Sequence, residues 1–369
     1  MNTQELLSPV TPRSRPVVSF PASQSLQVSG VSEIGAISTG LSQLDVAICP
    51  PSTVEGDLGS RGISKGHVTE VFGPPGVGKT ALALNIASNA LRAGEKVIWI
   101  DTGSPLPRLR LRDVLQNSIQ NSNLPQTVDD LVQSMTYIKA QSLPHLLAVL
   151  FHPPTTFPSK GCGLLVIDSA SGPFPSYFPN PTELKSRLAR AKITDKSQVQ
   201  WLMHRGSNVT SDLANQLMKL ATTHQMAILA VNQTRTKIRG QPRATLNPVL
   251  SGGSWETSIK TRILLYRDFP AKEEGSSRDI RYAEVMKRSG KMLALRADEN
   301  IVPFVVETDG LRALVNHPSP YTARLSPGEG PQLTVQRKRK VEEIADSQDE
   351  DSDAEYGWID GDDAGLHEK

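Results

Sequence analysis

The chain has 369 residues, of which 38% are hydrophobic and 21% are charged, and its formal net charge is +2. This composition suits a soluble globular protein with one large α/β domain plus tails, or with two ordinary domains. No segment approaches the ~20 apolar residues that cross a bilayer, so no membrane partner is expected, and two cysteines are too few for a zinc site or a disulfide framework.

Three regions are expected along the chain. Residues 1–33 are rich in Ser, Pro and Gln without a sustained period, which predicts a disordered N-terminal arm. A folded core is expected over residues 34–317, and it opens with a turn and a short helix around Ile37–Asp45. Residues 318–369 are expected to form a disordered tail.

A phosphate-binding loop follows the first long strand of the core. Strand Val68–Phe72 leads into a complete G-x4-G-K-[ST] segment, and helix Thr80–Ala93 follows it. In such a loop the backbone N–H groups and the helix N-terminus face the phosphates, the lysine reaches the β and γ oxygens, and the hydroxyl binds Mg²⁺. The sequence therefore predicts a site for ATP and Mg²⁺. Its residues are Gly73, Pro74, Pro75, Gly76, Val77, Gly78, Lys79 and Thr80.

A second part of this site is expected at the end of a later strand. Leu164–Asp168 is a short apolar run that ends in a carboxylate, the Walker B form. Strands ending in Asp are common, but this one follows the complete P-loop by ~90 residues. Asp168 is therefore predicted to hold Mg²⁺ together with Thr80 and to act with Lys79 on the nucleotide.

Two segments have a composition that suits contact with DNA. The second of them, Thr234–Leu250, carries its basic residues among Gly, Pro and Thr, and such a segment can meet phosphates without reading sequence. The first, from Ser169 to about Arg205, adds aromatic side chains that could stack on bases. A solvated basic face remains the alternative for both. The aromatic residues of the first segment are Phe174, Tyr177 and Phe178, and its basic residues are Lys185, Arg187, Arg190, Lys192 and Lys196. The basic residues of the second are Arg235, Lys237, Arg239 and Arg243.

The predicted fold is α/β. Further strands are expected at Val97–Asp101 and at Ala227–Val231, the latter after a helix near Ser211–Thr223. Apolar runs that alternate with helices predict a mostly parallel, twisted sheet with helices on both faces. After Ser251 the pattern changes to longer segments in which apolar and polar residues alternate. Such segments predict antiparallel edge strands at the C-terminal end of the sheet. These segments are Ile259–Arg267, Arg281–Lys287 and Phe304–Glu307.

The charge of the chain changes sign in its last part. Residues 341–369 hold 12 Asp/Glu and one Lys, so residues 1–340 carry the other 39 Lys/Arg against 26 Asp/Glu, a net charge of +13. A basic body suits a polyanion such as DNA. The cluster Arg337–Lys340, before the acidic segment, predicts a nuclear-localisation signal, with an ordinary solvated charge run as the alternative.

The series of motifs resembles the RecA-type recombinases of eukaryotes over roughly residues 34–315. The resemblance implies a RecA-like ATPase core. In that family a glutamine after the strand that follows Walker B senses the γ-phosphate and couples it to the DNA-binding loop that comes next. Gln233 matches this glutamine, and the resemblance implies that Thr234–Leu250 is that loop. The matching segments, in order, are Ile37–Asp45, Glu70–Thr80, Trp99–Thr102, Asp168–Ser169, Asn232–Gln233, Ser251–Trp255 and Thr261–Arg262.

Within this family the chain resembles a paralogue rather than the strand-exchange recombinase. The recombinase has a helical DNA-binding domain before its core, and only about 33 low-complexity residues precede the core here. The recombinase also places a water-orienting glutamate after an Ile-Asp-Thr stretch, where this chain has Gly103 after Ile100-Asp101-Thr102. Groups that position or activate the attacking water typically raise the reaction rate ~10²–10⁴-fold. Turnover should therefore be slow unless Asp101 or a partner substitutes.

The amino-acid sequences of the segments Glu70–Thr80 and Val97–Asp101 are most similar to those of the fungal mediator paralogues. These pair with a second paralogue and help the main recombinase to load and remain on single-stranded DNA. The resemblance thus implies a weak DNA-dependent ATPase in homologous recombination. One alternative is an autonomous strand-exchange recombinase. The other is a P-loop phosphotransferase acting on a small molecule, whose substrate lid and acceptor pocket have no signature in the sequence.

Overall fold

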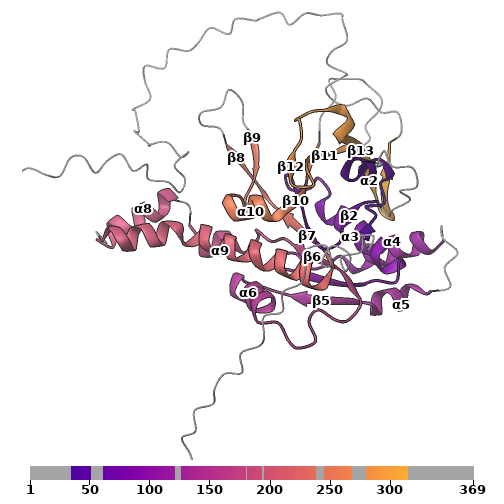
Figure 1. Ribbon diagram of the computed structural model, residues 1–369, viewed down its shortest axis with the longest axis horizontal. Coiled ribbons are helices and arrows are strands. Elements are labelled where there is room, and N and C mark those ends of the chain that lie inside the picture. Colours follow the sequence, from indigo (N-terminus) through magenta and orange to yellow (C-terminus); the bar gives the residue numbers. More distant parts are fainter. Residues whose placement is uncertain are drawn as a thin grey trace, which may run out of the picture.

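The computed structural model describes residues 35–50, 61–120, 126–179, 181–192, 195–237, 245–267 and 280–314. The predicted N-terminal arm (1–33) and tail (318–369) lie outside these residues, as does the basic cluster Arg337–Lys340. The boundaries of the core at 34 and 317 stay predictions. Figure 1 shows a central sheet with helices packed around it.

Within the described residues the central sheet has ten strands, in the order β14-β13-β11-β10-β3-β7-β6-β4-β5, with β12 paired to β11. The six strands from β10 to β5 are mutually parallel, and β11 to β14 pair antiparallel. The predicted fold class is confirmed. The strands are β3 (Val68–Phe72), β4 (Lys96–Asp101), β5 (Met135–Lys139), β6 (Cys162–Asp168), β7 (Ala227–Asn232), β10 (Ile259–Tyr266), β11 (Arg281–Arg288), β12 (Lys291–Met292), β13 (Ile301–Glu307) and β14 (Gly310–Ala313).

One part of the predicted topology was wrong. Segment Ile259–Arg267 was expected as an antiparallel edge strand, but β10 pairs parallel with β3 inside the sheet and antiparallel only with β11. The chain reaches β10 through the helix α10 (Gly253–Ser258), and such a crossover returns it to the same end of the sheet. The antiparallel part therefore starts one strand later than expected.

The helices cover both faces of the sheet because neighbouring residues of each strand point to opposite faces. Along β6, Leu164 and Val166 pack into one core, and Leu165 and Ile167 pack into the other. The first core includes α2, α3 and α4, and the second includes α6 and α9. The helices are α2 (Ser42–Ile48), α3 (Lys79–Arg92), α4 (Arg108–Gln120), α5 (Val128–Gln133), α6 (Leu143–Phe151), α7 (Phe174–Tyr177), α8 (Pro181–Arg190), α9 (Lys196–His224) and the 3₁₀ helix η1 (Asp298–Asn300).

The remaining strands form two small two-stranded sheets. β1 (Ala36–Ile37) pairs with β2 (Ile63–Ser64), and β8 (Thr234–Lys237) pairs with β9 (Thr245–Pro248), both antiparallel. The β8–β9 ribbon frames the second candidate DNA segment, of which residues 238–244 are outside the described part.

Helix α9 is much longer than the helix predicted near Ser211–Thr223. It has 29 residues, and burial begins only at Thr210 among those whose side chains are described. Its first part, with α8 beside it, extends beyond the sheet (Figure 1). No helix in the described ranges combines the length and apolar character that a membrane span requires.

Candidate nucleotide-binding site

The P-loop lies at the carboxyl end of the buried strand β3. The chain turns through Gly73–Gly78, and α3 begins at Lys79. Gly78 precedes the helix with φ of 103°, in the left-handed region that favours glycine. A Cβ atom on Gly73 would lie 2.2 Å from the carbonyl oxygen of Leu265, so this position has no room for a side chain. Both glycines are thus required by the shape of the loop.

The ammonium group of Lys79 lies over this loop. Its Nζ donates hydrogen bonds to the carbonyl oxygens of Gly73 at 2.7 Å and of Pro74 at 2.8 Å. Burial lowers the pKa of Lys79, and the negative charge of Asp168 partly offsets this. The cation is therefore held at the mouth of the loop, where a phosphate would lie above the backbone N–H groups.

Thr80 and Asp168 meet at the same edge of the sheet. The hydroxyl of Thr80 donates a hydrogen bond to Oδ2 of Asp168 at 2.7 Å. Burial raises the pKa of Asp168, while the Thr80 hydrogen bond and the Lys79 charge lower it. A hydroxyl and a carboxylate are the oxygen donors that Mg²⁺ prefers. The residues present thus fit a nucleotide with its magnesium ion.

The structure gives Asp101 two partners that the sequence did not indicate. Its Oδ1 accepts from the backbone N–H of Gly103 at 2.9 Å, and its Oδ2 accepts from the hydroxyl of Tyr137 at 2.6 Å. Asp101 is 1% exposed. Burial and the hydrogen bond to Asp101 raise the pKa of Tyr137. Because both oxygens are engaged, Asp101 is poorly placed to take over the role of a glutamate at position 103.

We predict that Asp101→Asn leaves the rate of ATP hydrolysis within about threefold of the parent, because a water-positioning group would cost ~10²-fold or more. The asparagine can accept from Gly103 N–H and donate to the Tyr137 hydroxyl, so the fold should persist. The measurement is steady-state phosphate release with single-stranded DNA present. Rapid turnover in the parent that Asp101→Asn abolishes would show that Asp101 does replace the missing glutamate.

Gln233 follows β7 directly and is exposed. Its backbone N–H donates to the hydroxyl of Ser171 at 2.8 Å, which ties the start of the second candidate DNA segment to the loop after β6. Arg235, on β8, is exposed, whereas the side chain of Lys237 and the whole of Arg239 and Arg243 lie outside the described part. The DNA-binding role of these four residues stays a prediction.

Sequence reasoning missed the role of Asn232, the residue before Gln233. Its side chain is buried and donates to Oε1 of Glu70 at 2.7 Å and to the carbonyl of Leu250 at 3.0 Å. It also accepts from the N–H of Leu250 at 3.3 Å. Asn232 therefore holds together the two ends of the segment Thr234–Leu250 and connects them to β3, the strand that leads into the P-loop.

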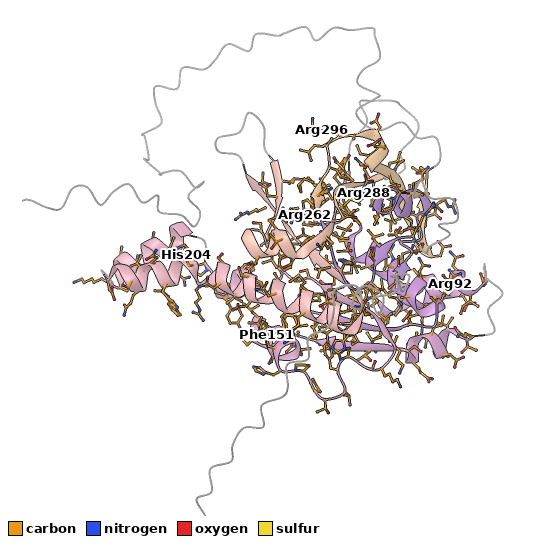
Figure 2. All side chains as sticks on the ribbon, viewed as in Figure 1. Arg92, Phe151, His204, Arg262, Arg288 and Arg296 are labelled. Carbon is orange, nitrogen blue, oxygen red and sulfur yellow. The ribbon has the colours of Figure 1, made fainter. Side chains whose placement is uncertain are left out.

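Glu70 is the centre of this buried polar cluster. Its side chain is fully buried and accepts from Trp255 Nε1 at 2.9 Å and from the guanidinium of Arg262. Arg262 also makes two hydrogen bonds to Glu256, at 2.8 and 3.0 Å. Figure 2 places Arg262 in the middle of the molecule. Trp255 is 0% exposed.

The first candidate DNA segment is a helical arm rather than a loop. Phe174 is 6% exposed and packs into the core beside α9, so the expected stacking role of this ring was wrong. Phe178 is partly buried against it, with ring centroids 5.8 Å apart, while Tyr177 is 41% exposed. The short turn that carries these rings needs apolar anchors, and two of the three aromatics serve that purpose.

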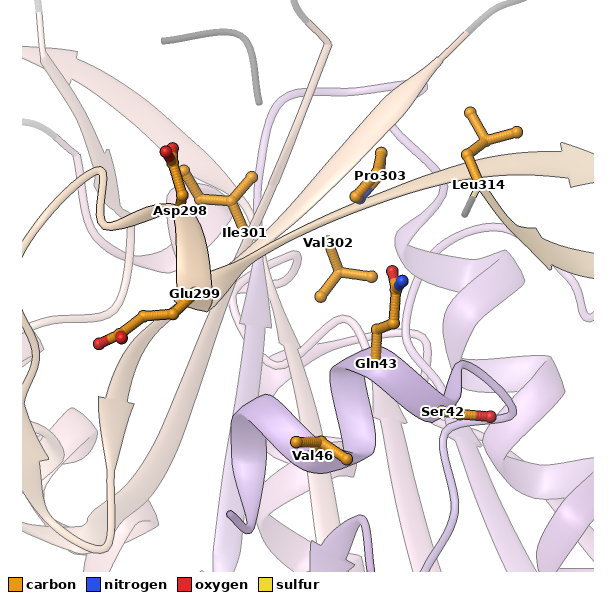
Figure 3. Close-up of a pocket in the computed structure, with 9 residues that line it drawn as sticks. All are labelled: Ser42, Gln43, Val46, Asp298, Glu299, Ile301, Val302, Pro303 and Leu314. Atoms are coloured by element: carbon orange, nitrogen blue, oxygen red, sulfur yellow. The ribbon is translucent and has the colours of Figure 1, made fainter. Parts of the chain in front are cut away.

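A cavity of about 450 Å³ lies elsewhere, between α2, η1 and β13 (Figure 3). Its lining includes Gln43, Val46 and Val302, with Asp298 and Glu299 from η1, and none of the P-loop residues. In the described part of the chain, no group of three or more His, Cys, Asp or Glu side chains could hold a metal ion. The candidate nucleotide site rests on the P-loop residues at the carboxyl edge of the sheet and not on this cavity.

A P-loop between a buried parallel strand and a helix, with a hydroxyl and a carboxylate paired beside it, is the arrangement of P-loop nucleotide-binding proteins. The antiparallel strands that extend the parallel sheet give it the RecA-like form.

Sequence comparisons agree with this class. The RecA N-terminal domain family matches residues 24–118. DNA repair protein rhp55 of Schizosaccharomyces pombe is 28% identical over an alignment of 274 residues, and the match covers 63% of this chain and 78% of that protein. DNA repair protein RAD51 homolog 3 of Cricetulus griseus is 25% identical over an alignment of 315 residues, and the match covers 79% of this chain and 74% of that protein. Protein RecA of Clostridium perfringens is 22% identical over an alignment of 294 residues, and the match covers 74% of this chain and 72% of that protein. The chain is therefore similar to proteins of the RecA family and, among them, to eukaryotic recombinase paralogues.

Proposed function

We propose that the protein is an ATP-binding recombinase paralogue that serves the repair of DNA double-strand breaks by homologous recombination. It assists the assembly or stability of the recombinase filament on single-stranded DNA and hydrolyses ATP weakly. The observation that carries the proposal is a complete P-loop with Thr80 and Asp168 paired beside it, next to an exposed Gly103 where a water-orienting carboxylate is lacking. The likeness to DNA repair protein rhp55 supports the role in repair.

In this proposal ATP acts mainly as a ligand. The backbone of Gly73–Gly78 and the ammonium of Lys79 bind the phosphates, and Thr80 with Asp168 holds Mg²⁺. Slow hydrolysis keeps the ATP-bound conformation occupied, and a ligand favours the conformation that it binds better. The long-lived state would present the surfaces that engage a second paralogue, as heterodimer partner, and the main recombinase. The site of action is the nucleus.

Gln233 would report the γ-phosphate to the basic segment, because it lies between the sheet edge and the β8–β9 ribbon. Asn232 supports this link, since it connects Leu250, at the far end of the segment, to Glu70 on β3. A displacement at the start of the segment Thr234–Leu250 would therefore also move its far end.

The competing functions differ in what they require at the site. An autonomous strand-exchange recombinase needs efficient DNA-dependent hydrolysis, which the open space around Gly103 and the engaged oxygens of Asp101 disfavour. A phosphotransferase acting on a small molecule would not respond to DNA. Stimulation of ATP turnover by single-stranded DNA, at a slow absolute rate, distinguishes the paralogue from both.

The test of the proposal joins DNA binding to filament stability. Replacement of Arg235, Lys237, Arg239 and Arg243 by Ala should weaken binding to single-stranded DNA and flatten its salt dependence, because fewer counterions are released when fewer phosphates are neutralised. It should also shorten the time that the recombinase remains on DNA in the presence of the protein and ATP. The measurements are log–log salt titrations and recombinase dissociation from labelled oligonucleotides.

Replacement of Lys219 by Ala, which removes an exposed cation from α9, is the control. An unchanged salt slope in the fourfold variant would place DNA binding elsewhere. A wild-type protein that does not prolong recombinase residence would contradict the proposed function itself.

A further inference from the structure

The projecting arm of α8 and α9 carries an exposed tryptophan. Trp201 is 59% exposed, and its neighbour one turn later, Arg205, is also exposed. Large aromatic side chains are mostly buried in folded proteins, and tryptophan in particular is highly buried on average. Trp99 and Trp255, in the sheet and in α10, follow that rule at 1% and 0% exposure. Trp201 departs from it.

The exposed ring is held in place by a row of stacked side chains. The guanidinium of Arg205 lies 5.7 Å from the centroid of Trp201 and 5.9 Å from that of Phe178. Phe178 in turn packs against the buried ring of Phe174 and over the backbone of Gly206, where a Cβ would lie 3.4 Å from it. The row thus runs from the core of the protein out to Trp201, which orders the indole without covering it.

The arm projects far enough from the sheet for a ligand to reach this ring. None of the described side chains between Ser197 and Val209 is buried, whereas Leu213 and Leu217 are. Fourteen helical residues before Thr210 correspond to roughly 20 Å. Figure 2 shows His204, next to Arg205, on the part of α9 that extends away from the sheet.

The charge of the arm indicates what the ligand is. Residues 181–205 contain six Lys/Arg and two Asp/Glu, a net charge of +4. One of the arginines, Arg187, is paired with Glu183, while Arg190 and Lys192 are exposed. A basic surface with an ordered, exposed aromatic face and a stacked arginine is the combination that binds single strands, since every base has a π-face.

We propose that Trp201 and Arg205 form a stacking platform for a base of single-stranded DNA, separate from the basic segment Thr234–Leu250. The inference rests on the proposed action on single-stranded DNA and adds a second contact to it. The aromatic residue in this role is Trp201 on the long helix, rather than the rings at positions 174–178 that lie at its base.

The indole itself supplies the test, because a base stacked on it quenches its fluorescence. The full-length protein with Trp358→Phe is titrated with oligothymidine, with Trp99 and Trp255 buried and therefore constant. We expect quenching on binding. Trp201→Ala should lose the quenching and weaken binding by about 5- to 150-fold, the equivalent of ~1–3 kcal/mol for one stacked base. Trp201→Phe should restore most of the affinity.

Met218→Ala, which removes another exposed apolar side chain from α9, is the matched control and should bind like the parent. Thermal unfolding of Trp201→Ala should match that of the parent, because the ring contributes little burial. Parent-like affinity in Trp201→Ala, or binding without quenching, would overturn the platform and leave the proposed function intact. Normal DNA binding with shortened recombinase residence would assign the ring to a protein partner instead. A parent protein that binds no single-stranded DNA would overturn both proposals.

Discussion

Lys79→Ala is expected to weaken ATP binding by about 10- to 150-fold, since a hydrogen bond to a charged group contributes about 1.5–3 kcal/mol. The ammonium is already positioned over the P-loop by the carbonyls of Gly73 and Pro74. A phosphate would therefore meet a fixed cation, and the alanine variant offers none in its place. Isothermal titration with ATP and Mg²⁺ measures the loss.

The control for this prediction is Lys65→Ala. Lys65 is also a partly buried lysine, but it pairs with Glu95 and not with the P-loop. The Lys65→Ala variant should bind ATP like the parent protein. ATP should also raise the unfolding temperature of the parent and of Lys65→Ala, because a ligand that binds only the native state stabilises it. Unchanged affinity in Lys79→Ala would refute the assignment of the P-loop.

The P-loop could be predicted from the sequence because its parts are neighbours in the chain. Strand, loop and helix follow one another from Val68 to Arg92, so the local pattern contains the whole geometry. The position of Asp168 required one further inference, namely that parallel strands end at a common edge of the sheet, which brings Asp168 beside the P-loop. The predicted strands around both elements agree with β3, β4, β6 and β7 to within two residues at each end.

The elements that could not be predicted from the sequence have weak local patterns of apolar residues. The strand β5 lies at the edge of the sheet and has no fully buried residue, so Met135–Lys139 lacks the apolar run that marks a central strand. The first half of α9 lacks a buried stripe and therefore a helical period. The direction of β10 is set by the crossover before it, and an alternating pattern is compatible with either direction.

The buried polar cluster could not be predicted because its members are far apart in sequence. Glu70 meets Asn232, Trp255 and Arg262 across 162, 185 and 192 residues. The sequence showed Trp255 only as a residue after a Gly-Gly turn. Contacts of this kind join β3, β7, α10 and β10, and they hold the start of the basic segment and the strand of the P-loop in one arrangement.

Arg262→Ala is expected to destabilise the protein by about 3–5 kcal/mol, the typical cost of breaking a buried ion pair. Glu70 is fully buried and Arg262 is 5% exposed, so removal of the guanidinium leaves an uncompensated carboxylate. The guanidinium also lies 5.9 Å from the centroid of Phe72, and that contact is lost with it. Urea unfolding of the full chain measures the change in free energy.

Arg312→Ala is the matched control, because Arg312 pairs with Glu307 at the surface, with side chains 64% and 36% exposed. Exposed pairs contribute about 0–1 kcal/mol. A loss of the same size in both variants would mean that the buried pair has no special role in stability.

The pH dependence of the Arg262→Ala variant tests the cause of the destabilisation. Burial raises the pKa of Glu70, and the charge of Arg262 is the largest influence that lowers it. Without Arg262 the pKa of Glu70 in the folded state rises further above its unfolded value. The folded state then binds the proton more tightly than the unfolded state, so stability is present at low pH and is lost as the pH rises through the folded pKa. We therefore expect the deficit relative to the parent to be smaller at about pH 5 than at about pH 8. A deficit independent of pH would show that lost packing around Phe72, rather than the unpaired charge of Glu70, accounts for the destabilisation.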